Sequence, residues 1–195
     1  SGNHIWDRQE IAEFMGQGQP VLRPLNYPEA APGSGYVIRK DVLVVSLLGR
    51  INIDCVDCPF ARIADLLDGL PDKPAVSIVD FHALDPMEKA AMGWYLDGRV
   101  SAVVGTHTHM PTADARLLPT GTAFVGDIGM VGPYNSVGGV EVEAVITRFR
   151  TRLPPGYVGY KAASGPIIFN SVLVEADEET GKAVSITRVD EMVEI

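Results

Sequence analysis

Continuous apolar runs separated by helix-forming stretches constrain the fold of this chain more than any other feature. Residues 42–48 (VLVVSLL), 75–79 and 100–104 are rich in valine and carry few polar side chains, which is typical of strands buried on both faces. A proline lies at the start of each of two expected helices, over 59–67 and 87–96. The alternation of strand and helix predicts an α/β fold with a mainly parallel sheet.

The rest of the chain extends this pattern without an obvious linker, so we expect one domain over 1–195. The remaining expected elements are a helix over 6–15, an irregular proline-rich segment over 18–35, a short strand over 123–125, a helix over 140–151 and an antiparallel hairpin formed by 166–176 and 182–193. The hairpin is predicted from its alternation of apolar and polar residues. It should close the C-terminal end of the sheet.

The charge of the chain narrows the range of partners. It has 16 Lys and Arg against 25 Asp and Glu, a formal net charge of −9. Binding to a long nucleic acid depends on many contacts between basic side chains and phosphates, so we expect no nucleic-acid polymer as partner. No apolar run approaches the roughly 18 residues that span a bilayer. We therefore expect no membrane partner and a cytoplasmic location.

Cys55 and Cys58 form a C-x-x-C pair, which is compatible with a redox pair or with half of a zinc site. The chain has no second pair to complete a four-cysteine zinc site. The surrounding residues suggest a loop that leads into a helix. We interpret the pair as two reduced loop cysteines.

The histidines are the strongest indication of chemistry, because all four lie outside the expected helices. His82 follows the second apolar run, and His107 and His109 form an H-x-H pair after the third. In open α/β sheets, sites assemble at the carboxyl ends of strands, and an H-x-H pair there is a common arrangement of metal ligands. His4 lies in a Gly-Asn-His turn, where the amide of Asn3 is a possible neutral ligand. A lone histidine is more often a surface or core residue, but together the four favour a metal site.

Five stretches of the sequence make this interpretation more specific. They are GNHIWD (2–7), LRPLNYP (22–28), DFHA (80–83), GWYLDGRVSAVVGTHTHMPTAD (93–114) and GTAFVGDIGMVGPYNSVGG (121–139). They resemble the YmdB-like family of bacterial cyclic-nucleotide phosphodiesterases, within the calcineurin-like metallophosphoesterase superfamily. The resemblance implies a four-layer α/β/β/α sandwich. It also implies hydrolysis of 2′,3′-cyclic nucleotides or related small phosphodiesters.

The resemblance further implies a role for each histidine. Asn3, His82 and His107 would bind one metal ion of a dinuclear pair, and His109 would bind the other. His4 would lie beside the scissile phosphate, as the general acid or as a hydrogen-bond donor to the developing charge. A ligand set of nitrogen and oxygen atoms with few thiolates favours iron or manganese, and zinc remains an alternative. Two such divalent ions would support phosphoester hydrolysis.

Four other residues are weaker candidates for contacts with the substrate. Arg23, Arg50 and Arg99 lie in or near the matched stretches and could hold a phosphate. Structural ion pairs or solvated surface positions are the alternative for each. Asp127, within the glycine-rich stretch, could shape the substrate rim, and a plain glycine turn explains that stretch equally well.

The start of the chain departs from the family pattern. The family begins with an Asp-containing motif and a Gly-Glu-Asn motif, which supply the carboxylates of the first metal, including a bridging one. This chain opens at Ser1, directly before the Gly-Asn-His turn. We therefore expect an N-terminally truncated domain that lacks roughly 60 residues, the size of two βα segments, and has a partial metal site. The exposed sheet edge left by this loss predicts a homo-oligomer.

Two alternatives to the enzyme remain open from the sequence. One is a non-catalytic nucleotide- or phosphate-binding protein that acts through partners, which the absence of the carboxylates favours. The other is a mononuclear zinc domain with a structural role, which should unfold when the metal is chelated.

Overall fold

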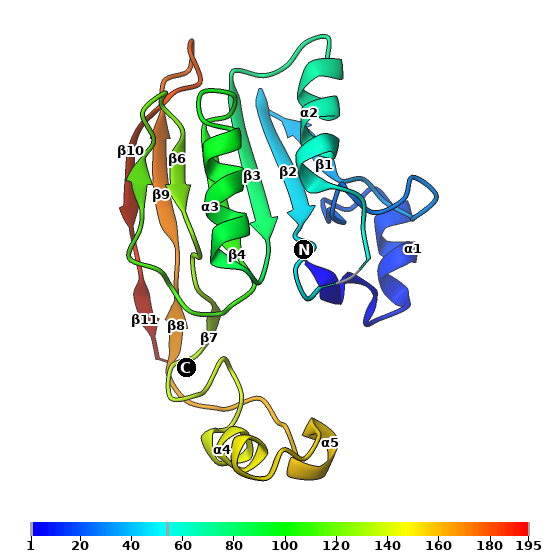
Figure 1. Ribbon diagram of the computed structural model, residues 1–195, viewed down its shortest axis with the longest axis vertical. Helices are drawn as coiled ribbons and strands as arrows, with labels where there is room; N and C mark the ends of the chain where they lie inside the picture. The colour runs from blue at the N-terminus through cyan, green and yellow to red at the C-terminus, as the bar shows by residue number, and fades with distance from the viewer. Residues whose placement is uncertain (1, 54, 195) are drawn as a thin grey trace.

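The centre of the molecule is a mixed six-stranded sheet. The computed structural model describes residues 2–53 and 55–194. The strand order of the sheet is β1-β2-β3-β4-β6-β5; β2, β3, β4 and β6 are parallel, and the edge strands β1 and β5 are antiparallel to their neighbours (Figure 1). The strands span Tyr36–Arg39 (β1), Val42–Leu48 (β2), Val76–His82 (β3), Ala102–Thr106 (β4), Arg116–Leu117 (β5) and Ala123–Val125 (β6). The predicted α/β class and parallel centre are confirmed.

Two helices, α2 (Pro59–Gly69) and α3 (Pro86–Tyr95), cover one face of this sheet (Figure 1). Ile63 of α2 and Met92 of α3 are fully buried in the same core cluster as Phe81 of β3. Asp85 caps α3 by accepting hydrogen bonds from the amides of the first turn, and the following proline fits the first helical position. This packing fixes the carboxyl ends of β3 and β4 side by side.

The opposite face of the sheet is covered in part by a hairpin of β9 (Val172–Ala176) and β10 (Ala183–Arg188). Ala102, Ala123 and Ala183 form a small buried cluster between hairpin and sheet. Because alanine side chains are short, the two layers approach closely. The predicted C-terminal hairpin is therefore confirmed over these two strands.

The outer ends of the predicted hairpin belong to a different sheet. β8 (Ile167–Phe169) pairs with both β7 (Val131–Pro133) and β11 (Glu191–Val193) in a three-stranded antiparallel sheet. The strand predicted over 166–176 is interrupted between β8 and β9, at Asn170. The Asn170 side chain donates a hydrogen bond to Asp190. The glycine-rich segment that follows β6 leads into this second sheet through β7.

The helices outside the sheet layers are short. A 3₁₀ turn, η1 (Asn3–Trp6), precedes α1 (Glu10–Gly16), so the helix expected over 6–15 begins later than predicted. α4 (Val142–Thr151) and α5 (Pro155–Val158) lie beyond the second sheet, away from α2 and α3 (Figure 1). In the described part of the chain, no helix has the length and apolar character needed to cross a membrane.

Candidate metal centre

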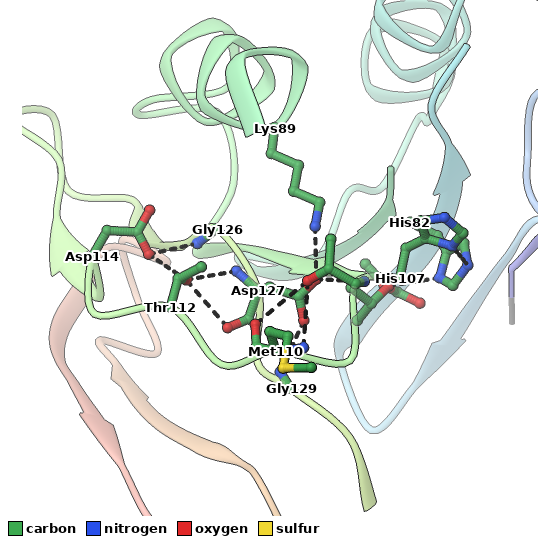
Figure 2. Close-up of polar contacts among 12 residues, drawn as sticks. His82, Lys89, His107, Met110, Thr112, Asp114, Gly126, Asp127 and Gly129 are labelled. Carbon is green, nitrogen blue, oxygen red and sulfur yellow. Dashed lines mark hydrogen bonds and ion pairs between the residues drawn. The ribbon is translucent and has the colours of Figure 1, made fainter. Parts of the chain in front are cut away.

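Two neighbouring parallel strands bring the central imidazoles together. β3 ends at His82, β4 ends at Thr106, and the register places these two residues opposite each other. His107 follows directly, so its ring lies against that of His82, with the ring centroids 4.7 Å apart (Figure 2). The predicted meeting of histidines at the carboxyl edge of the sheet is confirmed for this pair.

The side chain of Asn3 completes a convergent trio with the two rings. Asn3 Oδ1 lies 3.1 Å from His82 Nε2, and His107 Nδ1 lies 3.0 Å from the same nitrogen. Around a divalent ion with bonds of about 2.1 Å, neighbouring ligand atoms lie about 3.0–3.4 Å apart. The trio therefore has the donor chemistry and spacing of one face of a metal site.

The turn that carries Asn3 approaches His82 closely because residue 2 is glycine. A Cβ atom at Gly2 would lie 2.1 Å from His82 Nε2, far inside van der Waals contact. Ile5 is buried, and the Trp6 ring meets the Tyr27 ring edge-on at 5.9 Å, which hold the far side of the turn. The Gly-Asn-His motif is thus explained by close packing as well as by its polar groups.

Both central imidazoles are in the neutral form that metal binding needs. Burial, reinforced by the neighbouring His107, lowers the pKa of His82 to about 3. Burial, reinforced by the Lys89 ammonium, also lowers the pKa of His107. At neutral pH each ring can therefore offer a lone pair.

His109 and His4 lie near the trio but make other contacts. The ring of His109 is exposed, and its Nδ1 hydrogen-bonds the carbonyl of Gly138 at 2.8 Å. His4 is also exposed, and its Nδ1 contacts Asp7 Oδ2 at 3.0 Å. Within residues 2–53 and 55–194, no three His, Cys, Asp or Glu side chains gather as a ligand group. The convergent trio does not count as such a group, since one of its members is an amide.

An open pocket of about 340 Å³ connects His109 with the central pair. His82, Thr106, His107 and His109 line one side of it, and the other side is formed by residues 129–133, Gly138 and Gly139. The pocket is therefore bounded by the carboxyl edge of the sheet and by the glycine-rich segment. Its size suits a small ligand that reaches the imidazoles.

Asp127 anchors the H-x-H loop through hydrogen bonds to Thr108 (Figure 2). Its Oδ2 accepts hydrogen bonds from the amide and hydroxyl of Thr108, at 3.0 and 2.7 Å, and from Lys89 Nζ at 2.7 Å. The backbones of His107 and His109 have φ angles of 107° and 64°, a region that non-glycine residues adopt only when their surroundings impose it. The hydrogen bonds to Thr108, the residue between them, supply that constraint.

Asp127, a predicted substrate-rim residue, is buried and is not among the residues that line the histidine pocket. Asp127 is 1% exposed and Lys89 is 3% exposed. Burial alone would raise the pKa of Asp127, but hydrogen bonds from Lys89, Thr108 and Gly129 outweigh it and hold that pKa below its usual value. The carboxylate is therefore charged, saturated and turned away from the pocket.

Sequence reasoning missed the residues that support this loop. Thr112 Oγ1 accepts from the amide of Asp127 at 2.8 Å and donates to Asp114 Oδ1 at 2.6 Å, and the same oxygen of Asp114 accepts from the amide of Gly126 (Figure 2). Thr112 and Asp114 lie inside the matched stretch 93–114, which was the available signal. Lys89 had none, because a lysine in an amphipathic helix normally faces solvent.

The predicted arginine contacts are not assembled at the histidine pocket. Arg23 is buried, with its Nη1 donating to the carbonyl of Pro24 at 2.9 Å, and burial lowers its pKa. Arg99 lies before the amino end of β4, at the opposite edge of the sheet, and forms an ion pair with Asp68. Arg50 follows β2 at the histidine edge and is exposed. The positions of Arg23 and Arg99 give no support to substrate binding, and structural contacts explain both residues.

The sequence matches a known protein family over nearly its whole length. A family model described as YmdB-like protein matches residues 1–189. The chain belongs to the YmdB-like family. This YmdB-like chain is 43% identical over 192 residues to the 2′,3′-cyclic-nucleotide 2′-phosphodiesterase of Bacillus subtilis (strain 168), covering 96% of the chain and 72% of that enzyme.

Solved structures show the same YmdB-like fold. A hypothetical protein from Thermus thermophilus superimposes with a TM-score of 0.89 at 40% identity, covering 98% of this chain and 74% of that protein. A structure described as a novel phosphatase from Mycoplasma pneumoniae gives a TM-score of 0.87 at 28% identity, covering 99% and 71%. The chain thus shares its α/β architecture with these relatives over nearly its whole length.

Proposed function

We propose that this chain is a metal-dependent phosphodiesterase that hydrolyses 2′,3′-cyclic nucleotides or related small phosphodiesters. The observation that carries the proposal is the convergence of Asn3, His82 and His107 at the carboxyl edge of the sheet. The similarity to a named cyclic-nucleotide phosphodiesterase supports the choice of reaction and substrate. The open pocket beside the trio has room for a small phosphodiester.

Two divalent ions are part of this proposal. Asn3, His82 and His107 would hold one ion, and His109 would hold the other. The described donors are imidazole nitrogens and an amide oxygen, which favours iron or manganese and keeps zinc as an alternative. When bound, such ions lower the pKa of water and neutralise the charge that develops on the phosphate.

The donors in the trio are all neutral, so we propose that carboxylates from outside it complete a dinuclear site. Two dications held close together repel each other, and anionic ligands between them reduce that repulsion. The four-layer α/β/β/α sandwich belongs to the same proposal. So do self-association of the chain and its cytoplasmic location.

His4 is the proposed proton donor to the leaving ribose oxygen. Its contact with Asp7 through Nδ1 orients the ring and leaves Nε2 to carry the transferable proton. Because the ring is exposed, it can reach a substrate without rearrangement of the core. Removal of a general acid typically costs about 10²- to 10⁴-fold in rate.

The test is hydrolysis of 2′,3′-cyclic AMP by the purified protein loaded with manganese or iron. We expect turnover that is lost on chelation and in His107→Ala, whereas His4→Ala should retain bound metal and lose about 10²-fold or more in rate. Thermal unfolding of each variant serves as the control for folding.

A different outcome would replace the proposal. If the metal-loaded protein retains cyclic nucleotide without turning it over, and is also inert on simple phosphodiesters, it is a binding protein. That alternative has one structural observation in its favour, the neutral character of the described donors.

A further inference from the structure

The hydroxyl of Thr106 connects a carboxylate to the central histidine. Thr106 Oγ1 lies 2.8 Å from Asp80 Oδ1 and 2.9 Å from His82 Nδ1. Asp80 and His82 are two residues apart on β3 and therefore share one face of the sheet, and Thr106 is opposite His82 on β4. The three side chains form a continuous chain of hydrogen bonds that ends at the trio.

The number of available hydrogens fixes which group donates in each of these hydrogen bonds. In its metal-binding state His82 must offer an unprotonated Nε2, because this is the nitrogen that would bind the proposed ion together with Asn3 Oδ1 and His107 Nδ1. Its neutral ring then carries the hydrogen on Nδ1 and donates it to Thr106. The hydroxyl has a single hydrogen, which Thr106 donates to Asp80 Oδ1. An acceptor at Asp80 is thus needed to keep the hydroxyl of Thr106 oriented as an acceptor toward His82.

We infer that Asp80 and Thr106 are positioning residues that preset His82 in the Nδ1–H tautomer, with Nε2 directed at the metal. The inference rests on the proposed metal site and extends it by two residues, neither of which touches the substrate. Partners that orient a metal-bound histidine typically contribute about 10- to 100-fold in metal affinity. The opposite direction, with hydrogen passed from Asp80 through Thr106 to His82, would place a hydrogen on Nε2 and block the ligand position.

This relay of hydrogen bonds from His82 through Thr106 to Asp80 explains why a threonine ends β4. His82 is only partly exposed, so an unpaired Nδ1–H would carry a desolvation cost that the hydroxyl removes. Valine would fill the same volume and keep the β-branched shape that suits a strand. Thr106→Val therefore removes the hydrogen-bonding group with little change in packing.

The first arm of the test reads the tautomer directly in the metal-free protein. Long-range ¹H–¹⁵N correlation spectra distinguish Nδ1–H from Nε2–H, and the spectrum of His82→Gln assigns the signals. We expect His82 as Nδ1–H in the unaltered protein and in Thr106→Ser, and a shift toward Nε2–H in Thr106→Val. Asp80→Asn, with a weaker acceptor, should shift in the same direction by less.

The second arm measures the affinity for manganese by calorimetric titration. Thr106→Val should bind about 10- to 100-fold more weakly, and Thr106→Ser should recover most of that loss. Thr187→Val, a threonine-to-valine change on β10 away from the pocket, is the matched control and should leave tautomer and affinity unchanged.

The two arms separate this inference from the proposed function. An Nε2–H tautomer in the unaltered protein, or an unchanged tautomer in Thr106→Val, would overturn the relay whatever the enzyme does. Correct tautomer shifts together with an inactive metal-loaded protein would leave the relay standing and overturn the phosphodiesterase. If Thr106→Val does not fold, Asp80→Asn still decides the matter, because an unchanged tautomer in that variant would also overturn the inference.

Discussion

At the scale of single residues, the proposed metal site depends on close approach as much as on ligand type. Asn3 belongs to a turn that touches His82 only because Gly2 has no side chain. The histidines were visible in the sequence because they follow apolar runs. Only the family resemblance brought Asn3 and His82 together, because their contact joins residues 79 positions apart and depends on the path of the first turn.

Gly2→Ala should displace either His82 or the turn that carries Asn3. The added methyl group would overlap the His82 ring, whose Nδ1 is held by Thr106. We expect manganese affinity to fall by at least about 10-fold, in the range found when ligand orientation is lost.

The matched control is Gly16→Ala at the end of α1, where an added Cβ meets nothing within 4 Å. It should leave the affinity unchanged and the helix as stable as before or slightly more so. Equal affinities for the two variants, measured by the same titration, would contradict the steric argument.

At the scale of elements, the sequence predicted the interior better than the edges. β2 and β6 have the predicted ends, because each is a continuous apolar run between turn residues. β1, β5 and β7 were missed, because they are two to four residues long and their partly or fully exposed side chains give no clear period. The connection between α3 and the H-x-H loop was equally invisible, since it depends on one lysine that points inward.

Lys89→Met should show how strongly α3 is tied to that loop. The change leaves the Asp127 carboxylate buried without its cation, and breaking a buried pair typically costs about 3–5 kcal/mol. We expect a loss of this size in the free energy of unfolding, measured by urea denaturation. Hydrogen bonds from Thr108 and Gly129 place the expectation toward the lower end.

The comparison for this variant is Asp68→Asn, which breaks the ion pair with Arg99 on the surface. Exposed pairs contribute about 0–1 kcal/mol, so the unfolding free energy should change little. A similar small effect from Lys89→Met would mean that the buried pair does not fix the helix to the loop.

At the scale of the whole molecule, the buried imidazoles make stability depend on pH. The pKa of His82 is about 3 in the folded protein and about 6.5 in the unfolded chain, so the unfolded state binds more protons between these values. The metal-free protein should therefore lose stability as pH falls from about 6.5 toward 3. His107 contributes in the same direction.

Urea denaturation at a series of pH values, after chelation, measures this dependence. Burial raises the pKa of Asp80, which favours the folded state at low pH and opposes the histidines. The contribution of His82 is isolated by comparison with His82→Gln, whose stability should fall less steeply below about pH 6.5. Parallel curves for the two proteins would show that His82 is not held neutral by the fold.

The convergent trio has a consequence for how the chain is held together. Its members are separated by 79 and 25 residues along the chain, so an ion bound to all three would act as a cross-link between distant segments. An ion that binds only the folded chain stabilises it, and closing such long loops restricts the chain. At an ion concentration of about 100 times the dissociation constant, the free energy of unfolding would rise by about 2.7 kcal/mol. The first turn of the chain would then be fastened to the sheet by the proposed metal ligands themselves.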